Sequence, residues 1–515
     1  MKRVYIIVSI LSFIFASCSG FLEEYSQDTA YVRGYEDLDE LLLGSVYMPT
    51  KTPEHMGYTY GSDSWYYPYI HLMTDEVQEN IVSSSRGASW DARERYFGYY
   101  TWQQQVGIDV LGTSIRKEST DWNRIYKHIN IANMVLASID EQSAPKEDDK
   151  LEVIRIKGEA YFLRAAYYFT LVNLYGKPYT KTDSKTDLGV PIKNTEFIED
   201  KIYSRNTVDE VYTQVLADLG EAEKCLEQTT RKSIYRADIT ATYLLLSRVY
   251  LYMQNWEMAE SYAKKVLEKQ SELRDLNFMD GVSFFLDATL PEVIFTMGMG
   301  GIRYTISGLQ KDMGVSDELY ALYKDNDLRK TYFVKYNESD GYVEYVKGGA
   351  VADFSRTSLS ANFLFRTAEA YLNLAEATVY QGKEDDARKA LNDLRGKRLA
   401  TEQYADVEES GADLIELIRE ERGRELCLEG HRWFDLRRYM VCEKQPYSKT
   451  IRKSYTTFEY SYVTWSNVPV QTVVYQLEEN DAAYTLPIPK EVLEYNTGMK
   501  NNERGIRSVV ETINY

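Results

Sequence analysis

The sequence predicts a mainly α-helical fold, in which tetratricopeptide-like helix pairs form a solenoid scaffold with long loop-rich insertions and a few short strands. Two segments match the 34-residue tetratricopeptide pattern without a gap, and further amphipathic helices flank them. Long stretches between these helices have no helical period. A rigid scaffold interrupted in this way typically displays a binding surface that is built from its loops.

Helices are expected ahead of the repeats, beginning with residues 122–139. The next covers 159–175, where apolar residues recur with the spacing of one helix face. Its partner is expected at 208–226, after a loop insertion at 176–206. Thr207 stands immediately before this partner and is suited to cap its N-terminus.

The first complete repeat begins at Thr240, with Asn255-Trp256 at the turn between its two helices. Small residues are needed where the two helices cross closely, and aromatic residues fill the groove between neighbouring pairs. This pattern assigns Trp256 to the core. The positions that match the repeat are Tyr243, Leu246, Ser247, Tyr250, Ala259, Ala263, Val266 and Leu267.

The second repeat begins at Ala368 and turns at Gly382. A long helix at 414–438 is expected to follow it. The predicted helical scaffold therefore covers about 122–270 and 361–440. The positions that match this repeat are Tyr371, Leu374, Ala375, Ala387, Leu391 and Leu394.

Three regions without helical period separate the helical parts, at about 52–120, 270–360 and 444–515. The first is rich in aromatic residues, glycine and serine. Short strands are expected at Glu292–Met297 in the second region and at Thr472–Leu477 in the third, which is expected to end in a loop-like tail. These regions are the predicted loop-rich binding regions.

The N-terminus has the pattern of a secretory signal. Lys2 and Arg3 precede an apolar run at 4–16, which is shorter than the roughly 20 residues of a spanning helix. The run ends in Phe15-Ala16-Ser17-Cys18, which resembles the processing box of a bacterial lipoprotein. We expect cleavage before Cys18 and acylation of its thiol; the alternative is a cleaved signal with an incidental cysteine.

The predicted organisation is therefore a signal peptide at 1–17, an acylated N-terminus and linker at 18–35, and a single domain at 36–515.

The chain has 515 residues and a formal net charge of −19, with 44% apolar and 27% charged residues. This composition excludes a mostly disordered chain. The acidic balance argues against a nucleic-acid partner, which needs basic surface. The 45 tyrosines suit both helix packing and surface recognition.

Candidate catalytic motifs are better interpreted as structure. In EGHRWFDLRRY, Glu429 to Arg432 and His431 to Asp435 have the spacing of charge pairs that brace a helix. Gly298-Met-Gly-Gly301 precedes another strand-like run rather than a helix, which excludes a phosphate-binding loop. The chain has no GxSxG, HExxH or Walker sequence.

No cofactor is expected. Asp325-Asn326-Asp327 is interpreted as a solvated turn, with a structural calcium ion as the alternative that nothing else in the sequence supports. We expect no catalytic residues and no metal site, because a lone histidine beside one carboxylate falls short of a metal-ligand set.

The motifs of the whole chain resemble one family, the SusD/RagB outer-membrane lipoproteins of Bacteroidetes. The N-terminal Cys18-Ser-Gly-Phe-Leu-Glu is followed, in family order, by five longer motifs. They are GEAYFLRAAYYFTLVNLYG (158–176), ATYLLLSRVYLYMQNWEMAESYAKKVL (241–267), FRTAEAYLNLAEATVYQG (365–382) with ARKALNDLRGKR (387–398), LIREERGRELCLEGHRWFDLRRY (417–439) and LPIPKEVLEYNTGMKNN (486–502).

This resemblance implies a SusD-like fold and a cell-surface binding protein rather than an enzyme. Members capture oligosaccharides, or peptides in the RagB branch, and work with a SusC-like TonB-dependent transporter of the outer membrane. Glycan capture is the favoured hypothesis, peptide capture is the alternative, and a surface hydrolase is the third. The resemblance does not identify the ligand.

Candidate ligand contacts follow from the chemistry of sugars, which offer apolar ring faces and a rim of hydroxyl groups. Aromatic side chains stack on the faces, and charged or amide groups bind the rim. The N-terminal loop region has the composition best suited to this, and no family motif selects its residues. The predicted contacts in this region are Trp65, Tyr66, Asp75, Asn80, Arg86, Trp90, Tyr96, Tyr100 and Trp102. Arg303 and Tyr304 are further candidates in the later non-helical region.

Overall fold

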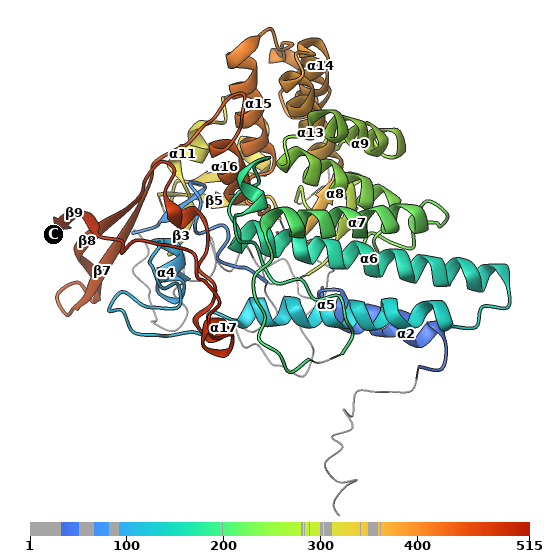
Figure 1. Ribbon diagram of the computed structural model, residues 1–515. Helices are drawn as coiled ribbons and strands as arrows, with labels where there is room; N and C mark the ends of the chain where they lie inside the picture. Colours follow the sequence, from blue (N-terminus) through green and yellow to red (C-terminus); the bar gives the residue numbers. More distant parts are fainter. Residues whose placement is uncertain are drawn as a thin grey trace, which may run out of the picture.

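The computed structural model describes residues 32–50, 66–81, 92–197, 199–279, 282, 284–287, 289–298, 302, 312–339, 341–348, 359–360 and 362–515. In Figure 1, helices stack from the lower right to the top, and a three-stranded sheet lies at the opposite side. The described helices include none with the length and hydropathy that crossing a membrane requires.

Consecutive helices pack side by side in pairs, which confirms the predicted tetratricopeptide-like scaffold (Figure 1). The predicted helices at 122–139 and 208–226 and both complete repeats are confirmed. The scaffold helices are α5 (Thr120–Ser138), α6 (Glu147–Tyr175), α7 (Val208–Leu226), α8 (Ile239–Tyr252), α9 (Trp256–Lys269), α13 (Thr367–Tyr380), α14 (Glu384–Arg395), α15 (Gly411–Glu425) and α16 (Arg432–Met440).

Local chemistry explains where these helices begin. Thr207 caps α7 as predicted, because its side chain accepts a hydrogen bond from the backbone N–H of Glu210 at 3.2 Å. Asn255 caps α9 by accepting from Met258 N at 3.3 Å. The small residues of the first repeat let α8 and α9 approach, so that Ser247 Oγ donates to the carbonyl of Ala259 at 3.0 Å.

Two helix boundaries differ from the sequence prediction. Helix α6 begins at Glu147 rather than at residue 159, and acidic side chains in its first turn favour that start. The single helix expected at 414–438 is instead split into α15 and α16. Leu428 and Gly430 take the left-handed conformation, with φ of 57° and 78°. This conformation interrupts the helical backbone between α15 and α16.

In the part of the chain that the structure describes, three antiparallel sheets complete the fold. The strand order is β1-β3-β5-β4 in the first, β2-β6 in the second and β7-β8-β9 in the third. The strands are β1 (Val77–Glu79), β2 (Val293–Thr296), β3 (Met313–Val315), β4 (Val334–Asn337), β5 (Tyr342–Tyr345), β6 (Leu364–Arg366), β7 (Ile451–Ser461), β8 (Ser466–Leu477) and β9 (Val509–Asn514).

The strands predicted at 292–297 and 472–477 are confirmed as β2 and part of β8. The loop-like tail was a wrong prediction, because β9 pairs with β8 near the C-terminus. Short helical elements connect the larger ones. They are α2 (Tyr35–Leu41), η1 (Leu42–Val46), α3 (Ala92–Arg95), α4 (Phe97–Tyr100), η3 (Ile139–Glu141), η4 (Asp183–Lys185), α11 (Asp317–Ala321), α12 (Arg329–Tyr332), η5 (Thr401–Gln403), η6 (Ala482–Tyr484) and α17 (Lys490–Tyr495).

The EGHRWFDLRRY segment is structural, as predicted, but the predicted charge pairs within one helix were wrong. Glu429 is buried and binds Arg366, with Oε2 2.8 Å from Nε. Asp435 binds Arg422 at 2.9 Å and Arg438 of its own helix at 2.8 Å, rather than His431. The segment joins distant parts of the chain through Glu429, whose partner Arg366 lies in β6.

In the Asp325-Asn326-Asp327 turn, both aspartate carboxylates form ion pairs with nearby cationic side chains. Asp325 lies 2.9 Å from Lys330 Nζ, and Asp327 lies 2.8 Å from Arg329 Nη2. Over the residues that the structure describes, no group of three His, Cys, Asp or Glu side chains could hold a metal ion.

Candidate functional site

Several predicted ligand contacts lie inside the protein. The described candidates are all buried, with exposed fractions of 9% or less. They are Tyr66, Asp75, Asn80, Tyr96, Tyr100 and Trp102. The remaining predicted site residues, Trp65, Arg86, Trp90, Arg303, Tyr304 and the acylation candidate Cys18, lie outside the described residues.

The buried candidates are held by contacts within the fold. Trp102 Nε1 donates to the carbonyl of Met73 at 3.0 Å. The Tyr66 hydroxyl lies 2.7 Å from His128 Nε2. Aromatic residues in an irregular segment pack a core as readily as they stack on a ligand, and here burial assigns these rings to packing.

The carboxylate of Asp75 forms ion pairs with two cationic side chains of the protein. It lies 2.6 Å from Arg432 Nη2 and 2.6 Å from Lys449 Nζ. Burial alone would raise the pKa of Asp75, but the two cations hold it well below its usual value. Its carboxylate therefore joins the N-terminal region to α16 and the segment before β7.

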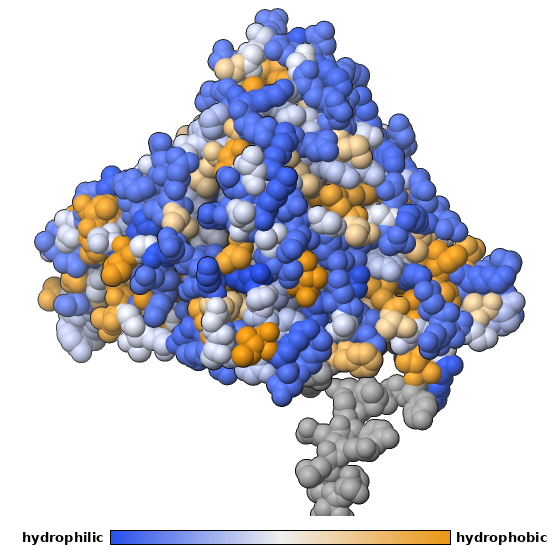
Figure 2. All heavy atoms as spheres, in the orientation of Figure 1, coloured by the Kyte–Doolittle hydropathy of each residue, from blue (hydrophilic) through white to orange (hydrophobic). Residues whose placement is uncertain are grey.

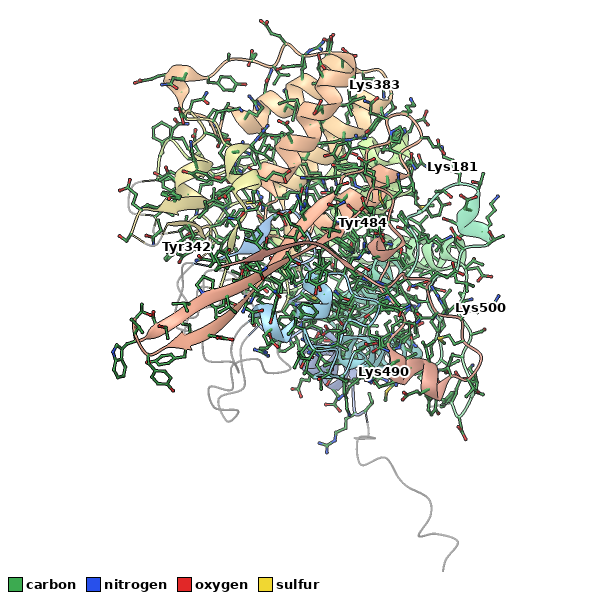
Figure 3. All side chains as sticks on the ribbon, turned by 90° about the vertical axis from the view of Figure 1, so that its left-hand side faces the viewer. Lys181, Tyr342, Lys383, Tyr484, Lys490 and Lys500 are labelled. Carbon is green, nitrogen blue, oxygen red and sulfur yellow. The ribbon has the colours of Figure 1, made fainter. Side chains whose placement is uncertain are left out.

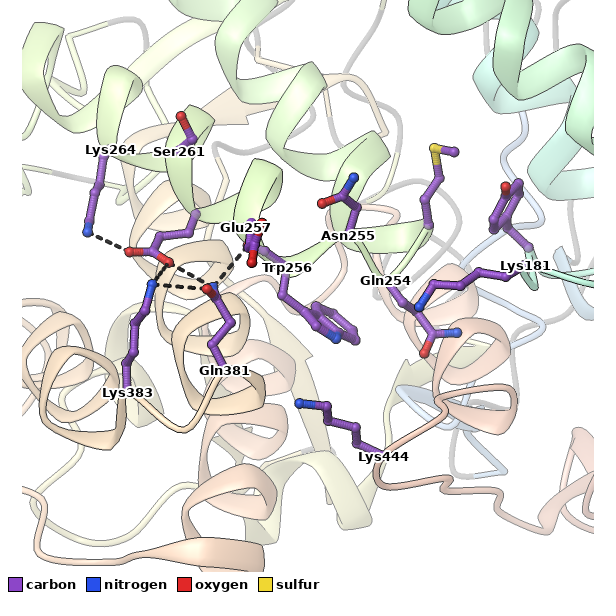
Figure 4. A pocket seen from close by; sticks show the side chains of 13 residues that line it. Lys181, Gln254, Asn255, Trp256, Glu257, Ser261, Lys264, Gln381, Lys383 and Lys444 are labelled. Carbon is purple, nitrogen blue, oxygen red and sulfur yellow. Dashed lines mark hydrogen bonds and ion pairs between the residues drawn. The ribbon is translucent and has the colours of Figure 1, made fainter.

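A groove on the helical scaffold is the described site with the most suitable chemistry for a ligand. It has a volume of about 1070 Å³ and lies where the start of α9 meets the turn between α13 and α14 (Figure 4). We call it the Trp256 groove. Its lining residues are Tyr179, Lys181, Met253, Gln254, Asn255, Trp256, Glu257, Glu260, Ser261, Lys264, Gln381, Lys383 and Lys444.

Trp256 forms the aromatic wall of the groove. It is the first residue of α9, and the Asn255 cap fixes the start of that helix. Its indole packs on Tyr380, with ring centroids 4.4 Å apart and planes inclined by 31°. The sequence pattern assigned Trp256 to the core; the structure shows a half-buried side chain that packs on the core and also lines the groove.

Glu260 organises one side of the groove. It binds Lys264 and Lys383 at 2.6 Å each, and it accepts a hydrogen bond from Gln381 Nε2 at 2.7 Å (Figure 4). Partial burial opposes ionisation, but these donors lower the pKa of Glu260 to about 2. One carboxylate is thus shared by two ammonium groups and offsets the charge of one of them.

Hydrogen bonds and an ion pair also hold the side chains on the other side of the groove, around Gln254. Gln254 donates to the carbonyl of Val441 at 2.9 Å and accepts from Glu443 N at 2.8 Å. Lys181 pairs with Glu443 at 2.9 Å, and the Lys444 ammonium donates to the carbonyl of Tyr380.

The Trp256 groove therefore combines one aromatic face with a rim of amides, ammonium groups and carboxylates. An aromatic face with polar groups around it suits a ligand with apolar faces and many hydroxyls. The groove is less suited to acid catalysis of glycoside cleavage, which needs a carboxyl with a raised pKa. Glu260 has a lowered one.

No local pattern in the sequence reveals this groove, because its walls come from four separate segments. The Asn255-Trp256 pair at a helix start was the one available signal, since a repeat turn lies at the edge of a solenoid.

Solved structures show the same fold. A SusD superfamily protein from Bacteroides thetaiotaomicron aligns with a TM-score of 0.67 and 23% identity, covering 92% of this chain and all of that one. A SusD-like carbohydrate binding protein from Bacteroides vulgatus aligns with a TM-score of 0.65 and 22% identity, covering 90% and 97% of the two chains. The stacked helix pairs with inserted sheets are thus a SusD-like fold.

Sequence comparisons agree with the fold. A model described as the SusD family matches residues 303–504, and one described as "Starch-binding associating with outer membrane" matches residues 67–251. The chain is also 25% identical over 434 residues to the starch-binding protein SusD of Bacteroides thetaiotaomicron, covering 66% of this chain and 74% of that protein. The chain belongs to the SusD/RagB family.

Proposed function

We propose that this protein is a cell-surface lipoprotein that captures oligosaccharides or polysaccharides and delivers them to a SusC-like TonB-dependent transporter in the outer membrane. The observation that carries the proposal is the relation to a starch-binding protein over 66% of the chain. The name of the matched B. vulgatus structure, a carbohydrate binding protein, supports the same ligand class.

The Trp256 groove supports a binding role. Its aromatic wall can stack on a pyranose ring, and its amides can bind hydroxyl groups at the rim of that ring. Glu260 offsets one of the two lysine charges beside it, so the groove has less positive charge than its lysines alone would give it. The relatives are described as binding proteins, and we accordingly propose no catalytic step.

Native affinity electrophoresis tests the capture of glycans. A soluble form that starts near Tyr25 is run through gels with and without plant, fungal and host polysaccharides. Retardation by one polymer, relative to a non-binding protein of similar size, is the expected result and names the glycan class. Migration that no polymer changes would contradict polysaccharide capture and shift the proposal to peptides, which calorimetry with peptide mixtures then tests.

Anchoring and delivery need separate tests. The full chain should fractionate with the outer membrane, and Cys18→Ala should release it into a soluble fraction. A detergent extract of the native membrane should yield the protein together with a transporter of the proposed class. A Cys18→Ala protein that stays in the membrane fraction would contradict acylation at this cysteine.

A further inference from the structure

The β7–β8 hairpin extends beyond the body of the protein (Figure 3). Its inner end is held by the fold, where Ile451 and Leu477 are buried and Thr456 N donates to Glu79 Oε1 at 3.0 Å. Its outer end carries the paired residues Ser461 and Ser466, which close a four-residue turn. The hairpin thus presents its turn to the surroundings from an anchored base.

The turn concentrates exposed aromatic side chains. Tyr462 and Trp465 are 78% and 76% exposed, and Tyr460 is 49% exposed. The Tyr460 and Tyr462 rings lie 5.1 Å apart at 81°, so they form one edge-to-face pair. We call Tyr460, Tyr462 and Trp465 the aromatic tip. Figure 2 shows further hydrophobic residues at this side of the molecule. Such clusters on an exposed surface mark interaction sites.

The turn itself does not explain this choice of residues. Trp465 has a φ of 53°, a left-handed conformation that glycine or asparagine adopts at lower cost. A tryptophan at this position weakens the turn and exposes a large ring, so its presence requires a benefit from what the ring contacts.

The polar groups around the aromatic tip indicate the chemical class of the ligand that the rings contact. From residue 459 to 470 the sequence has one charged residue, Glu459, and no lysine or arginine. Hydroxyl groups lie between the rings: Ser461 Oγ accepts from the N–H groups of Val463 and Thr464, and Ser466 Oγ donates to Thr464 Oγ1 at 2.9 Å. Peripheral binding to an anionic membrane is favoured by basic residues, which this turn lacks.

We propose that the aromatic tip is a second carbohydrate-contact site, which stacks on the pyranose rings of a neutral polysaccharide. This inference rests on the proposed capture of glycans and adds a contact outside the Trp256 groove. An uncharged tip of rings and hydroxyls fits a ligand with apolar faces and neutral hydroxyls. A long polymer could be held at both places, which would raise its overall affinity.

The test compares wild type, Tyr462→Ala/Trp465→Ala and Tyr495→Ala in gels that contain amylopectin, galactomannan, arabinoxylan or yeast mannan. Tyr495 is 65% exposed on α17 and serves as the matched control. The double variant should bind the retarding polymer about tenfold more weakly, the loss expected when aromatic stacking is removed. The control should behave as wild type. Equal melting curves check that the exposed substitutions leave the fold intact.

The possible failures are distinguishable. Equal retardation of wild type and the double variant would overturn the aromatic tip as a glycan site and leave the capture of glycans in place. Wild type that no polymer retards would overturn both proposals. Loss of co-sedimentation with phosphatidylethanolamine/phosphatidylglycerol vesicles in the double variant, without loss of glycan binding, would assign the tip to a lipid surface and overturn the inference.

Discussion

Arg366 Nη1 lies 2.6 Å from Glu425 Oε1, and both side chains are almost inaccessible to solvent. Glu425 also binds Arg398 at 2.9 Å and Arg329 at 3.0 Å. Burial alone would raise the pKa of Glu425, but the three guanidinium groups hold it well below its usual value. These residues lie in β6, α12, α15 and the segment after α14, so the pairs connect the helical scaffold to the inserted region.

Replacing Glu425 should strongly destabilise the fold. Glu425→Gln removes the carboxylate that three buried arginines share, although each arginine keeps at least one other carboxylate partner. Removing one partner of a buried ion pair costs about 3–5 kcal/mol. Urea unfolding measures the change in the free energy of unfolding. Lys389→Ala is the control, because Lys389 pairs with Asp393 at 2.8 Å on the surface and should contribute at most about 1 kcal/mol. Similar small losses in both variants would contradict a structural role for the buried network.

Glu76 should make stability fall as pH rises. Burial is the main cause that raises its pKa from 4.5 to about 7, although Leu428 N donates to it at 2.9 Å. The folded state therefore keeps this proton to about pH 7, whereas the unfolded state releases it near 4.5. The penalty is absent below pH 4.5, develops between pH 4.5 and 7, and reaches about 3 kcal/mol above that range.

Glu76→Gln removes the titrating group while keeping an acceptor for Leu428 N. Its free energy of unfolding minus that of wild type should rise by about 3 kcal/mol between pH 4.5 and 8. Denaturant unfolding at several pH values measures this difference, in which titrating groups distant from Glu76 cancel. A difference that stays constant with pH would show that Glu76 does not titrate in this range.

Two helix glycines should respond in opposite directions to alanine. A Cβ on Gly158 would lie 2.7 Å from Leu226 Cγ, because α6 and α7 pack closely there. Overpacking of this kind costs about 1–3 kcal/mol. A Cβ on Gly220 would meet nothing within 4 Å, so Gly220→Ala should stabilise α7 by about 0.5–1 kcal/mol. Thermal melting compares the variants, and stabilisation by Gly158→Ala would contradict the close packing of α6 on α7 at this position.

The helical scaffold could be predicted because its pattern is local. The small and aromatic positions from Tyr243 to Leu267 follow one repeat, and the Thr207 cap precedes a single apolar stripe. The break between α15 and α16 was not predictable in this way. It depends on the left-handed Leu428 and on Glu429, whose partner Arg366 lies far away in the sequence. Strand β9 likewise depends on pairing with β8.

The sequence predicts the kind of side chains that a glycan-binding surface needs, but not which residues lie on the surface. Composition distinguishes aromatic from non-aromatic segments, but it does not distinguish the buried Trp102 from the exposed Trp465. Trp256 was assigned to the core because it lies within a helical motif, and its place in the groove follows from where the α13–α14 turn and Lys444 lie. Such relations between distant segments leave no period in the sequence.

Trp256→Ala should weaken glycan binding about tenfold, because it removes the aromatic wall of the groove. Trp256→Phe keeps a ring on the Tyr380 face and should retain most of the affinity. Affinity gels with the polymer that retards wild type measure the effect, and circular dichroism checks the fold of both variants. Unchanged retardation of a folded Trp256→Ala protein would remove the Trp256 groove from the candidate sites.

Glu260→Gln should change the charge preference of the groove. Lys264 and Lys383 each lie 2.6 Å from Glu260, and both are about half exposed, so the loss of stability should be at most about 1 kcal/mol. Without the carboxylate, two ammonium groups face the groove without their shared anion. The variant should then be retarded by polygalacturonate at about 0.01 M salt and released at about 1 M, where charges are screened within a few ångströms.

Wild type should show little retardation by polygalacturonate at either salt concentration, because Glu260 remains ionised down to about pH 2. Its affinity for a neutral polymer should also change little with salt, since stacking and neutral hydrogen bonds are not screened. Glu257→Gln is the matched control, because Glu257 lines the same groove one helical turn earlier and has the same carboxylate. If polygalacturonate retards Glu257→Gln as strongly as Glu260→Gln, the total charge of the groove, rather than the pairing at Glu260, sets its preference.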